Sequence, residues 1–280
     1  MTIPTTVSSI EVTNVAEKTE FSRQIETYDI SRIDSSHPEF AAVGYMTAQI
    51  QGEDYIRSGY IEPSKLTEDG RMPDSVDQDK CSVVHYVAHP KGKGLSETQA
   101  ALKKISLNEG ESLDGLPAYK YCKNLLYIGW DSYLNENKQR IVEIGGLCRL
   151  DEVDSKMVSH ELMRDTMQHI VRQQSDEVWL MTFADKAYKS MVASFGESVI
   201  RQIGEPLTID EPDEHVMLRP CLIQPYSVVD DLYKTIKNDT PAELEGRRAM
   251  TLLFMADGLD DGELSDDVKM YLNEVRTALS

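Results

Sequence analysis

A glycine pair and a carboxylate stand close together in residues 140–150, which read RIVEIGGLCRL. Gly145 and Gly146 interrupt an apolar, β-branched run, a pattern typical of a β-bulge or of a close approach by another backbone. If this strand diverges from its neighbour, its free N–H and C=O groups can bond the amide groups of a pantetheine arm. Glu143, on the same strand, can then take a proton from an attacking amine, directly or through water. The same residues also fit a bulge without a ligand and a solvated strand glutamate.

Other patterns that often carry chemistry are absent or incomplete. The sequence has no G-x-S-x-G, G-x-x-x-x-G-K-[ST], H-E-x-x-H or G-x-G-x-x-G pattern, which argues against hydrolase, phosphate-loop and dinucleotide-binding functions. His85 and His89 are four residues apart without a third ligand nearby, so we expect ordinary strand-end histidines and no metal site. The acidic run of residues 257–268 has Leu259 and Val268 where a calcium loop needs oxygen ligands, so we predict a solvated turn there.

The elements that must position these residues follow from hydrophobic periodicity and from Gly and Pro punctuation. The first helix would carry Tyr45, Ile50 and Ile56 toward the core, and Gly196 would stop a later helix. Strands are predicted where short β-branched or aromatic runs occur. The predicted helices are residues 40–60, 156–174, 185–195, 226–237, 241–256 and 264–279, and the predicted strands are residues 81–88, 140–150, 178–183, 199–203 and 216–223.

From residue 140 onward the order of these elements is strand, helix, strand, helix, strand, strand. A strand-helix-strand step makes the strands of residues 142–150 and 178–183 parallel. We expect these two strands to be adjacent and to splay apart at their C-terminal ends, and the last two strands to pair antiparallel across a loop rich in Pro, Asp and Glu. The predicted fold class is α/β (α+β), a mixed central sheet flanked by helices, with a helical C-terminal extension.

Charge and composition narrow the class of protein. The 280 residues carry 48 acidic and 29 basic side chains, and the net charge of −19 disfavours binding to nucleic acid or to anionic lipid. The N-terminus lacks the apolar run of a secretory signal, and no stretch approaches 18 consecutive apolar residues, so we expect no membrane span and a cytoplasmic location. We expect four buried free thiols, which are Cys81, Cys122, Cys148 and Cys221.

A longer pattern follows the glycine pair. Residues 146–150 read GLCRL, and after them come a long helix, a short strand, a helix that ends at Phe195-Gly196, and a strand that leads to residues 203–206, IGEP. In order and length this segment resembles the GNAT-fold synthases that join an acyl chain to an amino acid or to S-adenosylmethionine, namely N-acyl amino acid synthases and acyl-homoserine-lactone (autoinducer) synthases. In those enzymes the first strand reads roughly E-L-S-R-L, and the last leads to I-G-E-P.

The N-terminal half is similar to the same enzymes more loosely. Arg57 and Tyr60 stand where the synthases have an R-x-x-x-Y segment, and Asp74, Asp77 and Asp79 stand in the place of an acidic cluster. Residues 82–88 and 102–105 stand where the synthases have the two strands that follow this cluster. The resemblance therefore extends over about residues 40–225.

Several departures from the family pattern change what the resemblance implies. The family glutamate falls on Gly146, three residues after Glu143, and Lys103 and Lys104 stand where the family has an arginine. Residues 149–159, RLDEVDSKMVS, contain no glycine, although ordinary GNAT acetyltransferases bind coenzyme A with a glycine-containing loop there. A glycine-free loop is a poor cradle for a pyrophosphate, which favours an acyl carrier protein as donor over acyl-CoA.

The resemblance implies transfer of an acyl group from a pantetheine thioester to the amine of an amino acid or related metabolite, with no tightly bound cofactor. Glu143 would be the base, and Tyr188 the acid that protonates the departing thiolate. Arg57, Asp77 and Asp79 would orient the amine substrate, the arginine by binding a carboxylate. The thioester would lie along the strand at Gly146, Leu147, Cys148, Arg149 and Leu150.

Two other functions stay open, a non-catalytic GNAT-like binding module and an ordinary acetyl-CoA-dependent N-acetyltransferase. We expect a flexible lead-in at residues 1–35, the acyltransferase domain at residues 36–225, and a helical, acidic C-terminal extension at residues 226–280. A carrier-protein partner would need a basic patch. The candidates for that patch are Lys103, Lys104, Lys120 and Lys123.

Overall fold

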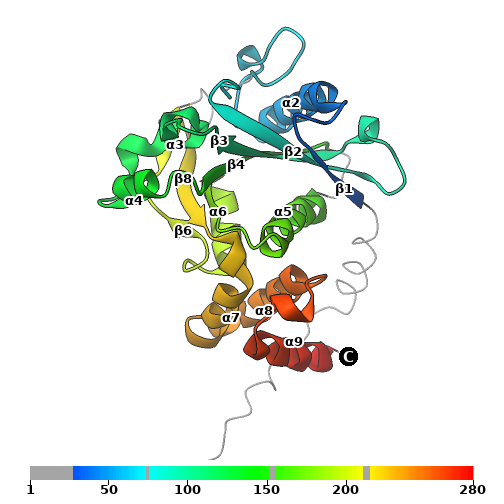
Figure 1. Cartoon of the computed structure of the whole chain (residues 1–280), viewed down its shortest axis with the longest axis vertical. Helices are drawn as coiled ribbons and strands as arrows, with labels where there is room; N and C mark the ends of the chain where they lie inside the picture. The colour runs from blue at the N-terminus through cyan, green and yellow to red at the C-terminus, as the bar shows by residue number, and fades with distance from the viewer. Residues whose placement is uncertain (1–27, 74–75, 152–154, 211–214, 280) are drawn as a thin grey trace, which may run out of the picture.

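A mixed eight-stranded sheet with helices on both faces forms the centre of the molecule (Figure 1). The computed structural model describes residues 28–73, 76–151, 155–210 and 215–279. The strands are β1 (Tyr28–Ile33), β2 (Cys81–Pro90), β3 (Ala100–Leu107), β4 (Ile141–Arg149), β5 (Val178–Ala184), β6 (Arg201–Gln202), β7 (Leu207–Asp210) and β8 (His215–Ile223). The predicted mixed α/β (α+β) class is confirmed.

The strand order is β1-β2-β3-β4-β5-β8-β6, and β7 also pairs with β8. Only β4 and β5 are parallel among the strand pairs of the described chain. Helix α5 (Ser155–Arg172) connects them, because parallel neighbours need a long crossover. The prediction of adjacent parallel strands at residues 142–150 and 178–183 is confirmed.

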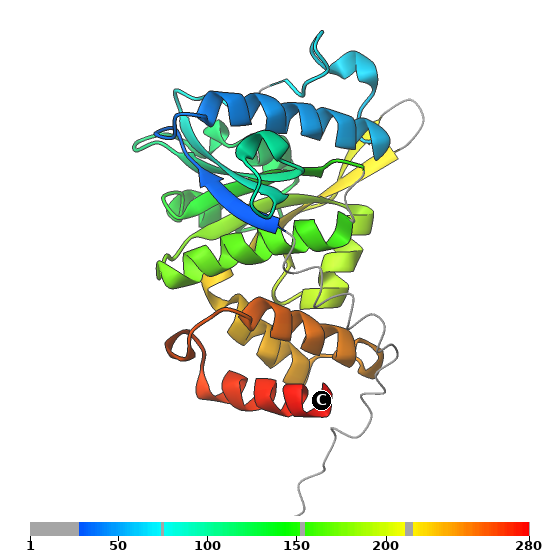
Figure 2. The ribbon, with the colours of Figure 1, turned by 90° about the vertical axis from the view of Figure 1, so that its right-hand side faces the viewer.

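Different helices cover the two faces of the sheet. Helix α2 (Phe40–Arg57) lies across one face and α5 across the other (Figure 2). The short helices α3 (Pro117–Cys122) and α4 (Trp130–Glu136) belong to the cluster on the α2 side, and α6 (Asp185–Phe195) packs against β5 and β8 within the core that α5 also covers. Helix α5 forms where predicted, because its apolar residues recur at helical spacing and are buried against the sheet.

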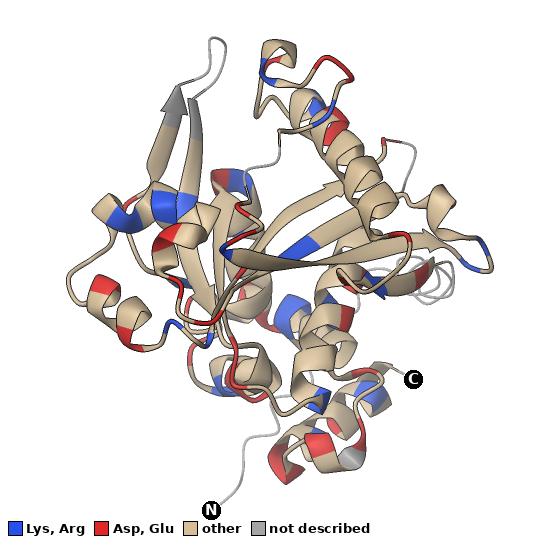
Figure 3. Ribbon diagram, turned by 45° about the horizontal axis from the view of Figure 1, so that its top comes forward, with Lys and Arg blue, Asp and Glu red and all other residues tan. Residues whose placement is uncertain are grey.

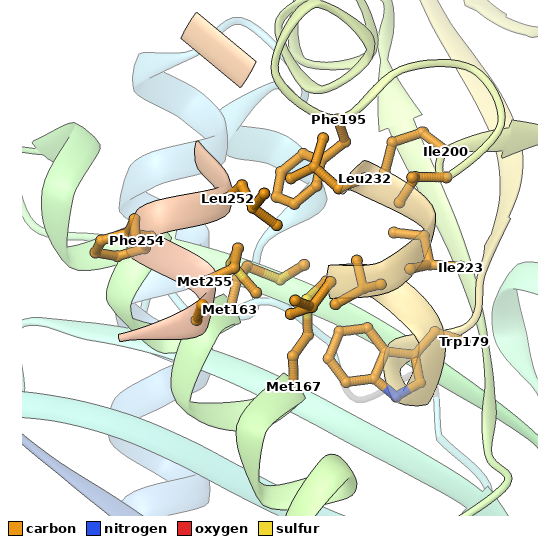
Figure 4. Packing of buried hydrophobic residues seen from close by; sticks show 14 of the residues in the cluster. Met163, Met167, Trp179, Phe195, Ile200, Ile223, Leu232, Leu252, Phe254 and Met255 are labelled. Carbon is orange, nitrogen blue, oxygen red and sulfur yellow. The ribbon is translucent and has the colours of Figure 1, made fainter. Parts of the chain in front are cut away.

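The three C-terminal helices share the main hydrophobic core with the sheet. These helices are α7 (Val228–Asn238), α8 (Ala242–Ala256) and α9 (Asp266–Leu279). Figure 4 shows Met163 and Met167 of α5 meeting Leu232 of α7 and Leu252 of α8, with Trp179 of β5 alongside. Residues 226–280 follow the strands and helices of the sheet region in the sequence. Their described helices complete the core beneath α5 and α6. Nowhere in the described chain is a helix both long and apolar enough to cross a membrane.

Some local predictions were wrong. Residues 28–33, assigned to a flexible lead-in, form β1 at the edge of the sheet and pair with β2 along their whole length; the rest of the lead-in, residues 1–27, lies outside the described residues. Residues 207–210, expected in a loop, form β7 because β8 supplies their backbone partners. The strand predicted at residues 199–203 shortens to β6, and α3 and α4 were not predicted. Ile50 is buried as predicted, but Tyr45 is exposed.

Candidate functional site

The parallel strands β4 and β5 separate partway along their length. They pair at Ile141 with Val178, Val142 with Trp179, and Glu143 with Leu180, and both strands continue beyond this point without pairing to each other. The predicted splay at their C-terminal ends is confirmed. The β5-facing edge of β4 beyond Ile144 is therefore open to a ligand that can hydrogen-bond to backbone groups.

A β-bulge interrupts the β3–β4 ladder a short distance beyond the point where β4 leaves β5. Ala101 pairs with Cys148 and Lys103 with Gly145, so Leu102 of β3 stands opposite two residues of β4. One of them is Gly146, whose φ of 62° lies in the left-handed region that favours glycine. The bulge that the glycine pair predicted is confirmed.

Glu143 lies at the apex of the split. Its carboxylate is buried, with 7% of the residue exposed, and Oε2 accepts a hydrogen bond of 2.7 Å from the backbone N–H of Ala118 on α3. Burial raises the pKa of Glu143 to about 7, and the bond from Ala118 only partly opposes this rise. A carboxyl group with a pKa near neutrality can exchange a proton at physiological pH, which is what a general base must do.

The glycine pair faces polar side chains on the α2 side of the sheet. A Cβ atom on Gly145 would lie 3.4 Å from Glu143 Oε1, and one on Gly146 would lie 3.3 Å from Gln51 Oε1 and 3.4 Å from Cγ and Cδ of Lys103. Glycine at both positions therefore leaves room for three polar side chains to gather beside the bulge.

The far end of β4 is held by α2. The Leu150 N–H donates to Gln99 O at 2.8 Å, and since bonding directions alternate along an antiparallel pair, the N–H and C=O of Arg149 point away from β3, toward the split. Arg149 N–H donates to Asp54 Oδ2 at 3.1 Å, and Arg57 Nη2 donates to Arg149 O at 3.0 Å. The Asp54 and Arg57 side chains thus form the hydrogen bonds with Arg149 that the backbone of a neighbouring strand would otherwise form.

The structure separates the residues that were assigned to the amine substrate. Arg57 also bonds Asp54 Oδ1 at 2.5 Å and lies 3.4 Å from Asp151 Oδ1, so its guanidinium is occupied at the end of β4. Asp77 and Asp79 precede β2, whose first residue pairs with the opposite end of β3, roughly 23 Å along that strand at ~3.3 Å per residue. The three residues do not form one subsite, and Asp77 instead pairs with Lys80.

Tyr188 lies over β8. The guanidinium of Arg219 is 5.1 Å from the centre of the Tyr188 ring, and burial raises the pKa of the Tyr188 hydroxyl. A raised pKa keeps the phenol protonated, as a proton donor requires, but β8 lies on the far side of β5 from the split. The role predicted for Tyr188 stays a prediction.

The strand predicted to bind the donor is partly buried. Cys148 points into the core under α2, where burial raises the pKa of its thiol to about 12, whereas Leu147, Arg149 and Leu150 are half-buried. All four cysteines are free and buried, as expected. Residues 152–154 of the glycine-free segment 149–159 lie outside the described residues.

The predicted basic patch is partly neutralised. Lys104 pairs with Glu177, Lys123 pairs with Asp114 at 2.7 Å, and Lys103 lies with its stem against the bulge. Along the ribbon in Figure 3, basic positions (blue) are interspersed with acidic ones (red). Lys120 remains the exposed candidate.

Two hollows with mixed polar and apolar linings lie away from the split in the described part of the chain. They surround Ser198, Arg201 and Asp231, and the larger has a volume of about 170 Å³. Val178, the first residue of β5, lines one of these hollows, so that hollow lies at the end of β5 opposite to the split. In the described part of the chain no three His, Cys, Asp or Glu side chains gather in a way that could hold a metal ion.

Two site residues, Gln51 and Asp54, were missed by reasoning from the sequence. They lie on the buried face of α2 together with Thr47. The spacing of 47, 51 and 54 is that of one helical face, and three polar residues on the face that also carries Ile50 are the signal that could have found them.

No protein-family model and no curated protein matches the chain. Solved structures do. BjaI, a CoA-dependent acyl-homoserine lactone synthase solved with SAM and isopentyl-CoA, is 14% identical with a TM-score of 0.50, and the match covers 80% of this chain and 99% of that one. MesI, also a CoA-dependent acyl-homoserine lactone synthase, is 10% identical with a TM-score of 0.49, over 85% and 100% of the two chains.

FeeM, an N-acyl amino acid synthase from uncultured soil microbes, is 10% identical with a TM-score of 0.46, over 73% of this chain and 96% of that one. At such identities the likeness is one of fold. The chain has a GNAT-like fold, and the resemblance to these synthases that residues 143–206 indicated is confirmed at that level.

Proposed function

We propose that this protein is an acyltransferase that moves an acyl group from a pantetheine thioester to the amine of an amino acid or related metabolite. The observation that carries the proposal is the position of Glu143, a buried carboxyl group with a pKa of about 7 at the apex of the β4–β5 split. The fold shared with BjaI supports the architecture of the proposal, and the chemistry rests on the residues of this chain.

The reaction is a direct attack. The thioester lies in the split against the unpaired edge of β4, with its carbonyl near Gly145 and Gly146. Glu143 takes a proton from the amine, the amine nitrogen forms a bond to the carbonyl carbon, and the bond from carbon to sulfur breaks with its electrons on the thiolate. Tyr188 is the proposed proton donor to that thiolate. A positioned base contributes typically 10²–10⁴-fold to such a step.

The test is substitution of the base. Glu143→Gln keeps the shape of the side chain and removes its basicity, so we expect acyl transfer to fall by at least about tenfold with the fold intact. Products are to be measured by mass spectrometry after incubation with acyl carrier protein or coenzyme A thioesters and a panel of amino acids and S-adenosylmethionine. Since deprotonation of Glu143 is required, the rate in the wild type should rise with pH through about 7.

Unchanged transfer by Glu143→Gln at equal stability would show that the base lies elsewhere. Absence of any N-acyl product with the wild type would instead favour a non-catalytic binding module. Tight binding of coenzyme A together with acetyl transfer would favour an ordinary N-acetyltransferase.

The proposed donor is an acyl carrier protein, because residues 149–159 contain no glycine to cradle a pyrophosphate. Lys120, which is exposed, is the candidate contact for the acidic carrier. Lys120→Glu should raise the KM for acyl carrier protein and leave the KM for the acyl-CoA of the same chain length unchanged. Added salt should likewise raise the KM for acyl carrier protein and leave the KM for acyl-CoA unchanged. Equal changes with both donors would argue against this contact.

A further inference from the structure

Gln51 presents an unpartnered oxygen beside the glycine pair of β4. The residue is buried, with 9% exposed, and its Oε1 has no hydrogen-bond partner among the described residues. The amide of Gln51 also forms a hydrogen bond with the side chain of Tyr55, one helical turn further along α2. This bond opposes the rise in the pKa of Tyr55 that burial causes. Buried acceptors in native proteins nearly always have a partner, and one without a partner destabilises the fold. The unpartnered Gln51 Oε1 beside the glycine pair therefore indicates an acceptor whose hydrogen bond is formed by a bound ligand.

The surroundings of Gln51 select the part of the reaction that it serves. Gln51 Oε1 and Glu143 Oε1 lie next to consecutive glycines, both on the face of β4 that α2 and α3 cover. On the opposite face Ile144 is buried in the main core under α5. A polar nucleophile must therefore approach a thioester in the split from the side of Gln51 and Glu143.

We propose that Gln51 Oε1 accepts a hydrogen bond from the amine of the acyl acceptor and aims its nitrogen at the thioester. Gln51 holds one N–H of the amine while Glu143 removes another proton, and the nitrogen lone pair is left to attack the carbonyl carbon. The proposal rests on the acyl transfer proposed above and adds a residue that binds the acceptor. It also explains why α2 carries a polar residue opposite the bulge.

The experiment compares Gln51→Met with the wild type, each with and without Tyr55→Phe. Methionine has nearly the same length and no acceptor oxygen, and the phenylalanine background removes the hydroxyl that the Gln51 amide otherwise serves. We expect the KM for the amine to rise about fivefold to tenfold, as loss of one hydrogen bond implies, with the KM for the thioester unchanged. In the Tyr55→Phe background Gln51→Met should not lower Tm, because it removes a buried acceptor that has no partner.

The conservative variant Gln51→Glu supplies the rescue. It keeps an acceptor oxygen at the same reach, so the KM for the amine should lie closer to the wild-type value than that of Gln51→Met.

Three results would overturn the role of Gln51. An unchanged KM for the amine would show that Gln51 does not contact it, and a rise only in the KM for the thioester would assign Gln51 to the donor arm. A fall in Tm with both KM values unchanged would make Gln51 a structural residue.

If the wild type forms no N-acyl product at all, the proposed function fails, and equilibrium dialysis of the same amino acids then tests Gln51 by itself. Binding to the wild type that Gln51→Met weakens would support Gln51 as an amine-binding residue. Equal binding to both proteins, or none to either, would overturn it.

Discussion

Glu143 places a carboxyl group where burial disfavours its charge. In the unfolded chain this group ionises near its ordinary value of 4.5, whereas in the folded protein it keeps its proton until about pH 7. The folded state therefore binds more protons than the unfolded state between these two values, and the free energy of unfolding must fall as pH rises through this window. The shift corresponds to roughly 3–4 kcal/mol at 1.36 kcal/mol per pKa unit.

This effect can be measured by urea unfolding at pH 4.5 and pH 8 in the wild type and in Glu143→Gln. Between these two pH values the free energy of unfolding should fall less in Glu143→Gln than in the wild type, because glutamine has no proton to release. Glu161, whose pKa burial also raises to about 7, remains in both proteins and contributes equally. Parallel stability profiles for the two proteins would show that Glu143 is ionised at little cost.

Gly146 carries the backbone geometry of the bulge. Its φ of 62° and the side chains of Gln51 and Lys103 within 3.4 Å of a Cβ make alanine strained and crowded. We expect Gly146→Ala to cost more than the ~1–2 kcal/mol that the left-handed conformation alone implies. The matched control is Gly110→Ala, where φ is 86° and no atom lies within 4 Å of the Cβ. Equal losses in a thermal melt would mean that the bulge has room for a methyl group.

At the scale of elements, the C-terminal turn of α2 determines how much of β4 is open. Asp54 and Arg57 satisfy the Arg149 N–H and C=O that face the split, so the proposed donor arm can bond the free edge of β4 only before Arg149. Hydrogen bonds to charged groups contribute about 1.5–3 kcal/mol each, more than a neutral pantetheine amide offers in exchange. The edge of β4 that is proposed to bind the donor therefore ends at Arg149.

Hydrogen exchange at the Arg149 amide tests this closure. In the wild type the amide should be protected, and Asp54→Ala should accelerate its exchange because the acceptor is gone. Asp69→Ala is the matched control, because it removes the exposed carboxylate that pairs with Arg71 on the same side of the molecule without touching β4. Fast exchange in the wild type would contradict the pairing of the Arg149 amide with α2.

At the scale of the whole molecule, the chain folds around one main core that includes its C-terminal helices. Leu252 of α8 is fully buried against residues of α5 and α7. Leu252→Ala should lower the free energy of unfolding by about 2–5 kcal/mol, as for other fully buried leucines. Met270 on α9 is exposed, and Met270→Ala should change stability by less than about 0.5 kcal/mol.

The cooperativity of unfolding gives a second measurement. If α7, α8 and α9 complete the core, fluorescence from the buried Trp179, measured in a Trp130→Phe background, and far-UV circular dichroism should report the same transition in urea. Loss of helix signal at a lower urea concentration than the Trp179 signal would show that the C-terminal helices unfold separately.

The sequence by itself determined the parts of the structure that local physics controls. The helix at residues 156–174 has strong periodicity, and the strand at residues 178–183 is a short continuous apolar run. The glycine pair at residues 145–146 allowed the bulge to be predicted, and few other residues tolerate the φ of Gly146. Glu143 could be named as a candidate base for the same reason, since it stands on the strand that carries the bulge. The parallel pairing of β4 with β5 followed from the single helix between them.

Only the tertiary structure decided which distant residues meet. β1 and β7 have weak local signals and become strands because β2 and β8 offer them backbone partners. Arg57 looked like a substrate residue in the sequence, but the packing of α2 on β4 gives its guanidinium to Asp54 and Arg149. The same packing brings Gln51 beside Gly146, 95 positions further along the chain. Periodicity predicts which face of a helix is buried, but it contains no information on which strand that face will cover, because this depends on the packing of the whole core.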